Sequence, residues 1–302
     1  MEEHPGFEPP SVAVVVATRD RPALIERAVE ALVHSLRPSD EALVVDSASS
    51  DPAVGEIVRR AGVGVLRLEV PGTSRARNAG MRATTAPVVA YIDDDCLVTE
   101  GWTAGIERAF ADPRIGFVTG RVLADRDSKL PISVVTGETP RRFDALQDPV
   151  AFGGGANMAF RRTAFEQVGG FDEHMGPATR MLAAEDQDVF WRIVRAGWAG
   201  AYDPSITVVH QQWRTTGEAV RRQFAYGIGS GAFAVKVRRL EPEQGWAMLR
   251  SRLWGDGIKQ GWRALRSGYE TGAVSGVVRA AGVLVGTARA LRTPLAEGHF
   301  SR

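Results

Sequence analysis

The sequence predicts an α/β protein with a mostly parallel sheet that carries helices on both faces, followed by a helical extension. Short apolar runs rich in β-branched residues alternate with helix-like segments through the first half of the chain. These runs are continuously apolar, which is typical of parallel strands that are covered on both faces. We expect a flexible N-terminus (1–10), a main domain (11–214) and a basic helical C-terminal region (215–302).

The first half of the chain contains four expected strands. Residues 12–17 (VAVVVA) form the first strand, and a helix over 21–35 follows, with Leu24, Ala28 and Leu32 on one face. Because strands and helices alternate in this way, crossover connections and a parallel sheet are expected. The remaining elements of this half are strands at 42–45, 63–70 and 88–92, and helices at 53–60 and 74–83.

The pattern becomes looser in the second half of the main domain. Residues 125–149 are polar and irregular, and we expect an insertion there. A glycine-rich turn at 153–155 then leads into another strand. The other expected elements are a strand at 117–120, a helix at 186–196, and a short strand at 207–209 that ends at His210.

Composition and charge limit the class of protein. The chain has 302 residues, and its net charge of +1 conceals an acidic main domain and a basic C-terminal region. The single cysteine, Cys96, excludes an internal disulfide and fits a reducing compartment. Residues 1–10 lack the apolar segment of a signal peptide, and the apolar stretch at 273–291 is interrupted by arginine. We therefore expect a cytoplasmic protein, with the inner face of the membrane as an alternative location.

Three adjacent carboxylates, Asp93, Asp94 and Asp95, follow the apolar run at 88–92. Like charges at neighbouring positions repel each other, so such a cluster is tolerated in water or near a cation. Ligands bind at the carboxyl ends of strands in open α/β sheets, and this position favours a site. An acidic turn that caps the next helix is the alternative interpretation.

Other polar residues also follow expected strands, or lie where strand ends converge. Asp95 and His210 together offer an oxygen and an imidazole nitrogen to a divalent cation. Asp186, next to Glu185, is a candidate general base, whereas Asp188 is expected to be a surface or capping charge. Asp46 is a candidate ligand-binding residue, and its alternative role is to cap the helix at 53–60.

Seven motifs occur in a characteristic order, and together they resemble the family-2 inverting glycosyltransferases. The motifs are VVVATRDRP, LVVDSASSD, PGTSRARNAG, VAYIDDD, FGGGANMAFRR with FDEHMG, AEDQDVFWRIVRAGW, and VVH. The resemblance covers roughly residues 11–214. It implies the GT-A fold, a Rossmann-like sheet that binds a nucleotide sugar, and a Mn²⁺ or Mg²⁺ cofactor.

The resemblance also implies roles for individual residues on the donor side. Asp93 would face the ribose and Asp95 the metal, with His210 completing the metal shell, while Asp94 has no separate role within the nucleotide site. Arg77 would contact the base or a phosphate, although Arg75 and Arg82 lie near the same helix. The first two strands would contribute the nucleoside contacts Ala17, Thr18, Arg19 and Asp46.

On the acceptor side, the resemblance implies that Asp186 is the catalytic base, with Glu185 beside it. The glycine loop, including Gly154 and Gly155, would line the acceptor site. Independently of the resemblance, Trp191 is a candidate for stacking on a sugar, with packing in the core as the alternative. The donor would be a nucleoside-diphosphate sugar, with UDP or dTDP as the first choices and GDP open. The acceptor hydroxyl is unknown.

Other functions use different motifs. A sugar nucleotidyltransferase uses a glycine-rich loop after the first strand, where this chain has TRDRP. A dinucleotide-dependent oxidoreductase would have GxGxxG there, and a non-catalytic sugar-binding module would not need both carboxylate motifs.

The basic C-terminal region has two interpretations. It is either a subdomain that closes the acceptor site or, around residues 217–239, an amphipathic surface for anionic membranes. No nucleic-acid partner is expected, because no aromatic and basic RNA-binding motif is present. A homodimer is left open.

Overall fold

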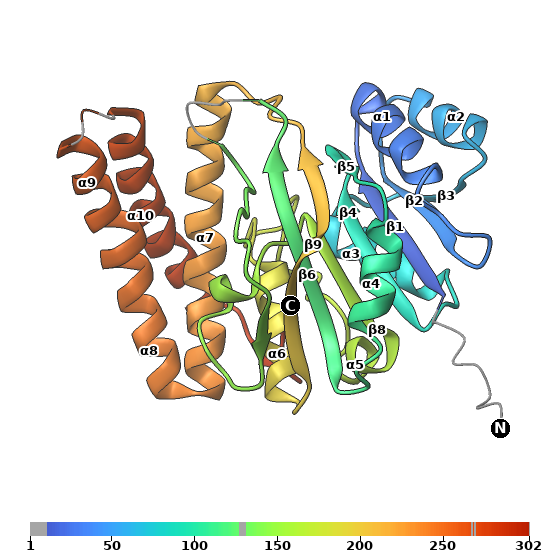
Figure 1. Cartoon of the computed structure of the whole chain (residues 1–302). Coiled ribbons are helices and arrows are strands. Elements are labelled where there is room, and N and C mark those ends of the chain that lie inside the picture. The colour runs from blue at the N-terminus through green and yellow to red at the C-terminus, as the bar shows by residue number, and fades with distance from the viewer. Residues whose placement is uncertain (1–10, 127–130, 267, 269, 302) are drawn as a thin grey trace.

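The computed structural model describes residues 11–126, 131–266, 268 and 270–301. The expectation of a flexible N-terminus at 1–10 lies outside this part of the chain. A large mixed sheet forms the centre of the molecule, and helices cover both of its faces (Figure 1). Its strands are β1 (Val12–Thr18), β2 (Glu41–Ser47), β3 (Gly64–Leu68), β4 (Val88–Asp93), β5 (Cys96–Val98), β6 (Ile115–Ala124), β7 (Arg141–Phe143), β8 (Asn157–Arg161) and β9 (Ala199–His210).

The first half of the sheet is parallel, as predicted. Strands β3, β2, β1 and β4 lie side by side in that order, and each neighbouring pair is parallel. The second half is mixed: β8 enters antiparallel between β4 and β6, and β5 and β7 pair antiparallel with β9. Only β6 and β9 are parallel to each other among the described pairs of this half.

Strands β6 and β9 are much longer than the sequence predicts. Their predicted spans were 117–120 and 207–209, whereas they pair in parallel from Ile115 to Ala124 and from Ala199 to His210. The ladder shifts register between Gly120 and Arg121, and Pro204 lies in the skipped part of β9. Because a neighbouring strand can extend a ladder past a proline bulge, local pattern underestimates such strands.

Alternate residues of β1 point into two different cores. Val12, Val14 and Val16 pack with α1 (Pro22–Val33), α2 (Ala53–Arg60) and α4 (Trp102–Ala109). Val15 packs on the other face, in a core shared with α3 (Thr73–Arg82), α5 (Arg162–Gln167) and α6 (Glu185–Arg195). The period of two thus divides the side chains of β1 between the two faces of the sheet. Because β1, β2 and β4 are parallel, their carboxyl ends lie at one edge of the sheet.

The C-terminal region forms a layer of long helices beside α6 (Figure 1). Helix α7 (Thr216–Leu240) begins with a capping box made by Thr215 and Glu218, which satisfies its first backbone donors. The outer layer consists of α8 (Pro242–Arg250), the π-helical segment η2 (Ser251–Lys259), α9 (Gln260–Arg266) and α10 (Glu270–Leu291). The C-terminal hairpin of β10 (Leu295–Ala296) and β11 (His299–Phe300) follows. The prediction of an amphipathic surface over 217–239 is not supported, because residues 227–237 of α7 are buried.

A buried charge network joins α6, α7 and the C-terminus. The Lys236 ammonium lies 2.6 Å from Asp172 and 2.7 Å from Asp188, and all three side chains are fully buried. Asp188 also accepts hydrogen bonds from Arg192, and the Phe300 backbone N–H donates to Asp172. The expectation that Asp188 is a surface or capping charge is therefore wrong, because α7 covers this side of α6 and supplies a cation there.

Replacing Lys236 with methionine is expected to lower the free energy of unfolding by about 3–5 kcal/mol, because two buried carboxylates would lose their shared cation. Urea denaturation followed by circular dichroism measures this change. Lys259→Met is the control, because Lys259 is exposed and its loss is expected to matter by less than about 0.5 kcal/mol. A Lys236→Met variant as stable as the control would show that the network contributes nothing.

Candidate functional site

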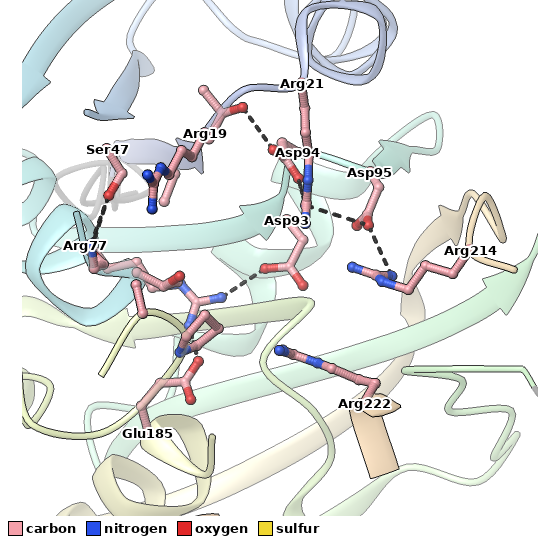
Figure 2. A pocket seen from close by; sticks show the side chains of 16 residues that line it. Arg19, Arg21, Ser47, Arg77, Asp93, Asp94, Asp95, Glu185, Arg214 and Arg222 are labelled. Carbon is pink, nitrogen blue, oxygen red and sulfur yellow. Dashed lines mark hydrogen bonds and ion pairs between the residues drawn. The ribbon is translucent and has the colours of Figure 1, made fainter. Parts of the chain in front are cut away.

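The carboxyl ends of β1 and β4 open into a cavity of about 300 Å³. Because these strands are parallel and adjacent, Ala17 lies opposite Asp93 in the ladder, and the three aspartates meet the loop that follows β1. Helices α3, α6 and α7 supply the other walls (Figure 2). Eight residues predicted for the site line this cavity: Ala17, Thr18, Arg19, Arg77, Asp93, Asp94, Asp95 and Glu185.

The structure gives the three adjacent aspartates different environments. The side chain of Asp93 is one-third exposed and faces the cavity, where it lies 2.7 Å from Arg77. Asp94 is buried and accepts hydrogen bonds of 2.7 Å from Thr18 and Arg21. Burial raises the pKa of Asp94 to about 6, although the nearby Arg21 guanidinium opposes the shift. Asp94 therefore anchors the loop after β1, and Asp93 is the freer of the two.

Asp95 is buried at the point where β5 and β9 pair. Its carboxylate lies 3.2 Å from His210 Nε2 and accepts a 2.8 Å hydrogen bond from the Trp213 indole. Burial alone would raise the pKa of Asp95, but the hydrogen bonds from His210 and Trp213 hold it below its ordinary value. Asp95 is consequently ionised at neutral pH.

The donor atoms around Asp95 fit a divalent cation. Asp95, Cys96 and His210 each offer a ligand atom, and these atoms lie within 4.8 Å of one another. Burial raises the pKa of the Cys96 thiol well above its ordinary value, so it does not act as a thiolate. The remaining carboxylate oxygen and imidazole nitrogen suit Mn²⁺, and the carboxylate also suits Mg²⁺.

Gln212 controls which nitrogen of His210 carries the proton. Its amide is oriented by two hydrogen bonds of 3.1 Å to the backbone of Ile132, and its Nε2 group points to His210 Nδ1. In this arrangement Nδ1 accepts, and Nε2–H donates to Asp95. Coordination through Nε2 would move that proton to Nδ1 and require Gln212 to turn.

Among the three candidate arginines near α3, only Arg77 reaches the cavity. Its buried guanidinium lies 2.7 Å from Asp93 and 3.0 Å from Glu185 (Figure 2). Arg75 instead pairs with Glu173, and Arg82 is exposed at the end of the helix. Asn78 does not line the cavity; it exchanges two hydrogen bonds of 2.9 Å with the backbone of Phe171 and so holds the loop before α6.

Asp46 lies at the end of β2, outside the cavity that the other predicted residues share. One carboxylate oxygen accepts from the Ser49 backbone, and the other lies 2.7 Å from Arg67. Asp46 lines a neighbouring cavity together with Arg67 and Val65. The alternative role as a helix cap is wrong, because α2 has no side-chain cap hydrogen bond and the Ala53 N–H is met by Asp51.

A second cavity of about 240 Å³ lies on the other side of Asp93 and Glu185. The glycine loop, with Gly154 and Gly155, forms one wall, and the beginning of α6 forms another. The Gly155 N–H donates to Asp186 Oδ2 at 2.8 Å, and the Gln187 N–H donates to Oδ1. Burial raises the pKa of Asp186 above its ordinary value, despite these donors. A carboxylate with a raised pKa in a cavity is suited to accept a proton.

Trp191 differs from its predicted place beside the acceptor. Its indole is fully buried, donates to Gln244 at 3.0 Å and packs edge-on against Phe233. Trp191 lies five residues after Asp186 on α6, so it faces α7 and α8 instead of the cavity. In this structure it anchors the helix that carries the candidate base.

Several cavity residues were not singled out from the sequence. Arg21 and Arg214 both stack on Trp213, at 4.9 and 4.4 Å from its ring, and lie 3.9 and 3.5 Å from Asp95. Arg222 from α7 lines both cavities, and Figure 2 shows its side chain pointing into the first one. The dense arginines of the TRDRP and QWR segments were the available signal for the first two. Nothing local distinguishes Arg222 from its neighbour Arg221.

Replacing Gly155 with alanine is expected to lower, at least tenfold, the rate of a reaction in which Asp186 accepts the proton. The new Cβ would lie 3.0 Å from both Cβ and Oδ2 of Asp186, closer than normal contact, and would displace the carboxylate. Gly154→Ala is the matched comparison, because its Cβ would meet only Val135 at 3.8 Å, and a much smaller loss is expected. Steady-state turnover of both variants tests this, and equal losses would contradict it.

Comparison with known sequences identifies relatives of this chain. A family model described as Glycosyl transferase family 2 matches residues 13–169, just over half of the chain. The chain is 29% identical over 244 residues to the pre-mycofactocin glycosyltransferase of Mycobacterium tuberculosis, covering 74% of this chain and 48% of that protein. It is 22% identical to the O-antigen chain rhamnosyltransferase RfbN of Salmonella typhimurium, covering 72% and 71%. The chain thus spans about half the length of the mycobacterial relative.

Comparison with solved structures identifies the fold. A mannosyltransferase from Pyrobaculum calidifontis, PcManGT, solved in complex with GDP-Man and Mn²⁺, superposes with a TM-score of 0.64 at 18% identity. The match covers 95% of this chain and 88% of that one. The C-terminal helices are therefore largely included in the shared architecture.

Proposed function

Because the chain belongs to glycosyltransferase family 2, with the GT-A fold, we propose that it transfers a sugar from a nucleoside-diphosphate sugar to an acceptor hydroxyl, with inversion. The observation that carries this proposal is the pair of adjoining cavities. They share Arg77, Asp93, Glu185 and Arg222 as lining residues. One cavity is lined by the strand-end aspartates and the other by Asp186. A transferase needs such an arrangement, because the donor and the acceptor must meet at the anomeric carbon.

The first cavity has the chemistry of a nucleoside diphosphate site. Asp93 presents a partly exposed carboxylate to ribose hydroxyls, and Ala17, Thr18 and Arg19 border the space for the nucleoside. Arg21, Arg214 and Arg222 surround the opposite part of the cavity, where they can neutralise the diphosphate. We propose that Asp46 contacts the base from its neighbouring cavity, after Arg67 moves aside.

Asp95 and His210 are the residues that would hold Mn²⁺ or Mg²⁺. When bound there, the cation supplies positive charge to the leaving diphosphate. Arg21 and Arg214 lie beside Asp95 and would be available to phosphate oxygens of the donor. Trp213 holds both guanidinium groups close to the site.

In the proposed mechanism, Asp186 removes the proton from the acceptor hydroxyl. The Gly155 and Gln187 N–H groups hold the carboxylate in place while the hydroxyl oxygen attacks the anomeric carbon. The attack comes from the acceptor cavity, opposite the bond to the diphosphate, so the configuration inverts. Arg222 and Arg77 stabilise the negative charge of the departing nucleotide.

We propose UDP or dTDP as the donor nucleotide, with GDP as the alternative, since PcManGT binds GDP-Man. Thermal-shift measurements with UDP, dTDP and GDP, each with and without Mn²⁺, test the donor site. The nucleotide that binds is expected to raise the Tm by several degrees only when Mn²⁺ is present. Release of nucleoside diphosphate from the matching donor sugar, dependent on an acceptor, then tests transfer. If no nucleotide binds with or without metal, the proposed function is wrong.

A further inference from the structure

Helix α10 exposes an apolar stripe to solvent. Its exposed residues are spaced three, four, three and seven positions apart, which places them on one face. Val277 is 67% exposed and Leu284 is 59% exposed. Among residues 271–291, the exposed side chains of this helix are Val274, Val277, Ala281, Leu284 and Leu291. A soluble surface helix normally shows the opposite pattern, with its apolar face turned inward.

The neighbouring helices present three exposed tryptophans. Trp246 on α8, Trp254 on η2 and Trp262 on α9 are 51%, 64% and 60% exposed. Ile258 and Leu265, which are three or four positions from the nearest of these tryptophans in the chain, are also exposed. Segments η2 and α9 pack on α10, and together these helices form the layer farthest from the sheet (Figure 1). We call their exposed residues the outer face. An exposed apolar area of this kind is typical of a surface that binds another protein or a membrane.

Basic residues accompany the tryptophans on the outer face. Arg250, Lys259, Arg263 and Arg266 are all exposed. Glu243 is the one exposed acidic residue in the described part of 242–266. Tryptophan with arginine and lysine is the combination that suits the headgroup layer of an anionic membrane, where an indole is half-buried and a cation meets lipid phosphate.

The inner side of these helices leaves no space into which the apolar residues could turn. A Cβ on Gly227 of α7 would lie 2.1 Å from the Arg279 carbonyl oxygen on α10, and one on Gly257 would lie 2.7 Å from Ala280 Cβ. The charged groups inside are also partnered, since Asp256 lies 3.1 Å from Arg252 and 3.9 Å from Arg279. Because the helices behind the outer face are already closely packed, its apolar side chains have no room to turn inward and remain exposed to solvent.

We propose that the outer face of α8, η2, α9 and α10 docks on an anionic lipid bilayer, with the helices lying in the plane of its surface. Helix α10 is long and apolar enough to cross a membrane, but a third of it is buried within the protein. Spanning would expose Arg279 and break its contact with α7. A second copy of the chain is a poorer occupant, because a symmetric interface would bring two basic surfaces together.

Sedimentation of the full chain with phospholipid vesicles tests the proposal. We expect binding to vesicles that contain phosphatidylglycerol and much weaker binding to phosphatidylcholine alone. The double variant Val277→Asp, Leu284→Asp is expected to bind at least tenfold more weakly, whereas Val33→Asp, on an exposed valine of α1, is expected to bind like the wild type. Replacing Lys259 and Arg263 with glutamine is expected to weaken binding by roughly fivefold per charge.

The tryptophan emission of the wild-type chain provides a second readout that needs no variant. A shift to shorter wavelength and protection from acrylamide are expected on adding phosphatidylglycerol vesicles. Absence of vesicle binding overturns the proposal, whether the chain is a monomer or a dimer by light scattering. A dimer that the double variant dissociates would identify a second copy as the occupant. Vesicle binding should be unchanged in Asp186→Asn, so this test is separate from that of the proposed function.

Discussion

Replacing Asp186 with asparagine is expected to lower the rate of sugar transfer by about 10²–10⁴-fold, the usual contribution of a general base. Asparagine keeps the size of the side chain, but it cannot take a proton. Its single oxygen can accept only one of the two hydrogen bonds that Gly155 and Gln187 donate to the carboxylate. Turnover with a saturating donor and acceptor measures the loss. Nucleotide affinity measured by calorimetry is expected to change little, because Asp186 lines the acceptor cavity and not the donor cavity.

The pH profile supplies the control for this assignment. The base must be ionised, and burial raises the pKa of Asp186, so turnover is expected to fall with decreasing pH well before the ordinary aspartate value of 3.8 is reached. Asp94 has a pKa raised to about 6 and could produce a similar limb. If the residual activity of Asp186→Asn keeps the same acid limb, the limb belongs to another group. Normal turnover in this variant would exclude Asp186 as the base.

Replacing Asp95 with asparagine is expected to weaken Mn²⁺-dependent nucleotide binding by more than about 100-fold, because the site loses its one anionic oxygen ligand. The variant should retain the weak nucleotide binding that needs no metal. Calorimetric titration of the nucleotide with and without Mn²⁺ separates these two quantities.

Asp144→Asn is the matched control for Asp95, because Asp144 is exposed and lines neither of the two cavities. Its metal-dependent affinity is expected to equal that of the wild type. The Asp95 assignment fails if Asp95→Asn binds nucleotide with an undiminished dependence on Mn²⁺. A parallel test with His210→Ala would show how far the imidazole contributes, since its Nε2 proton now faces Asp95.

Most of the donor site could be predicted from the sequence because its residues follow strands directly. A continuous apolar strand followed by a polar residue places that residue at the carboxyl edge of the sheet, and this pattern alone located Asp93. Ala17 and Thr18 were proposed from the family resemblance. Asp46 obeys the same rule but lies in a neighbouring cavity, because Arg67 on β3 draws its carboxylate away. The rule predicts that a residue lies at this edge of the sheet, but it does not predict which residue its side chain pairs with.

The acceptor side depended more on tertiary structure. Gly155 and Asp186 were both expected there, but the hydrogen bond between them could not be foreseen, because it joins a loop to a helix 31 residues later. Trp191 and Asp188 were misplaced for a related reason. Their positions depend on α7, which covers α6 with Phe233 and Lys236, and no local pattern in α6 indicates that cover.

The α/β class, the parallel order of the first strands and the identity of the strand-end carboxylates all follow from the amino-acid sequence, because apolar period and strand endings are local properties. The antiparallel insertion of β8, the separate environments of Asp93, Asp94 and Asp95, and the position of Arg222 between the two cavities emerge only in the folded chain. Only the folded chain also shows which of the C-terminal helices are exposed to solvent. These features follow from packing and charge pairing between segments far apart in the chain, and such contacts leave no signal in any single segment.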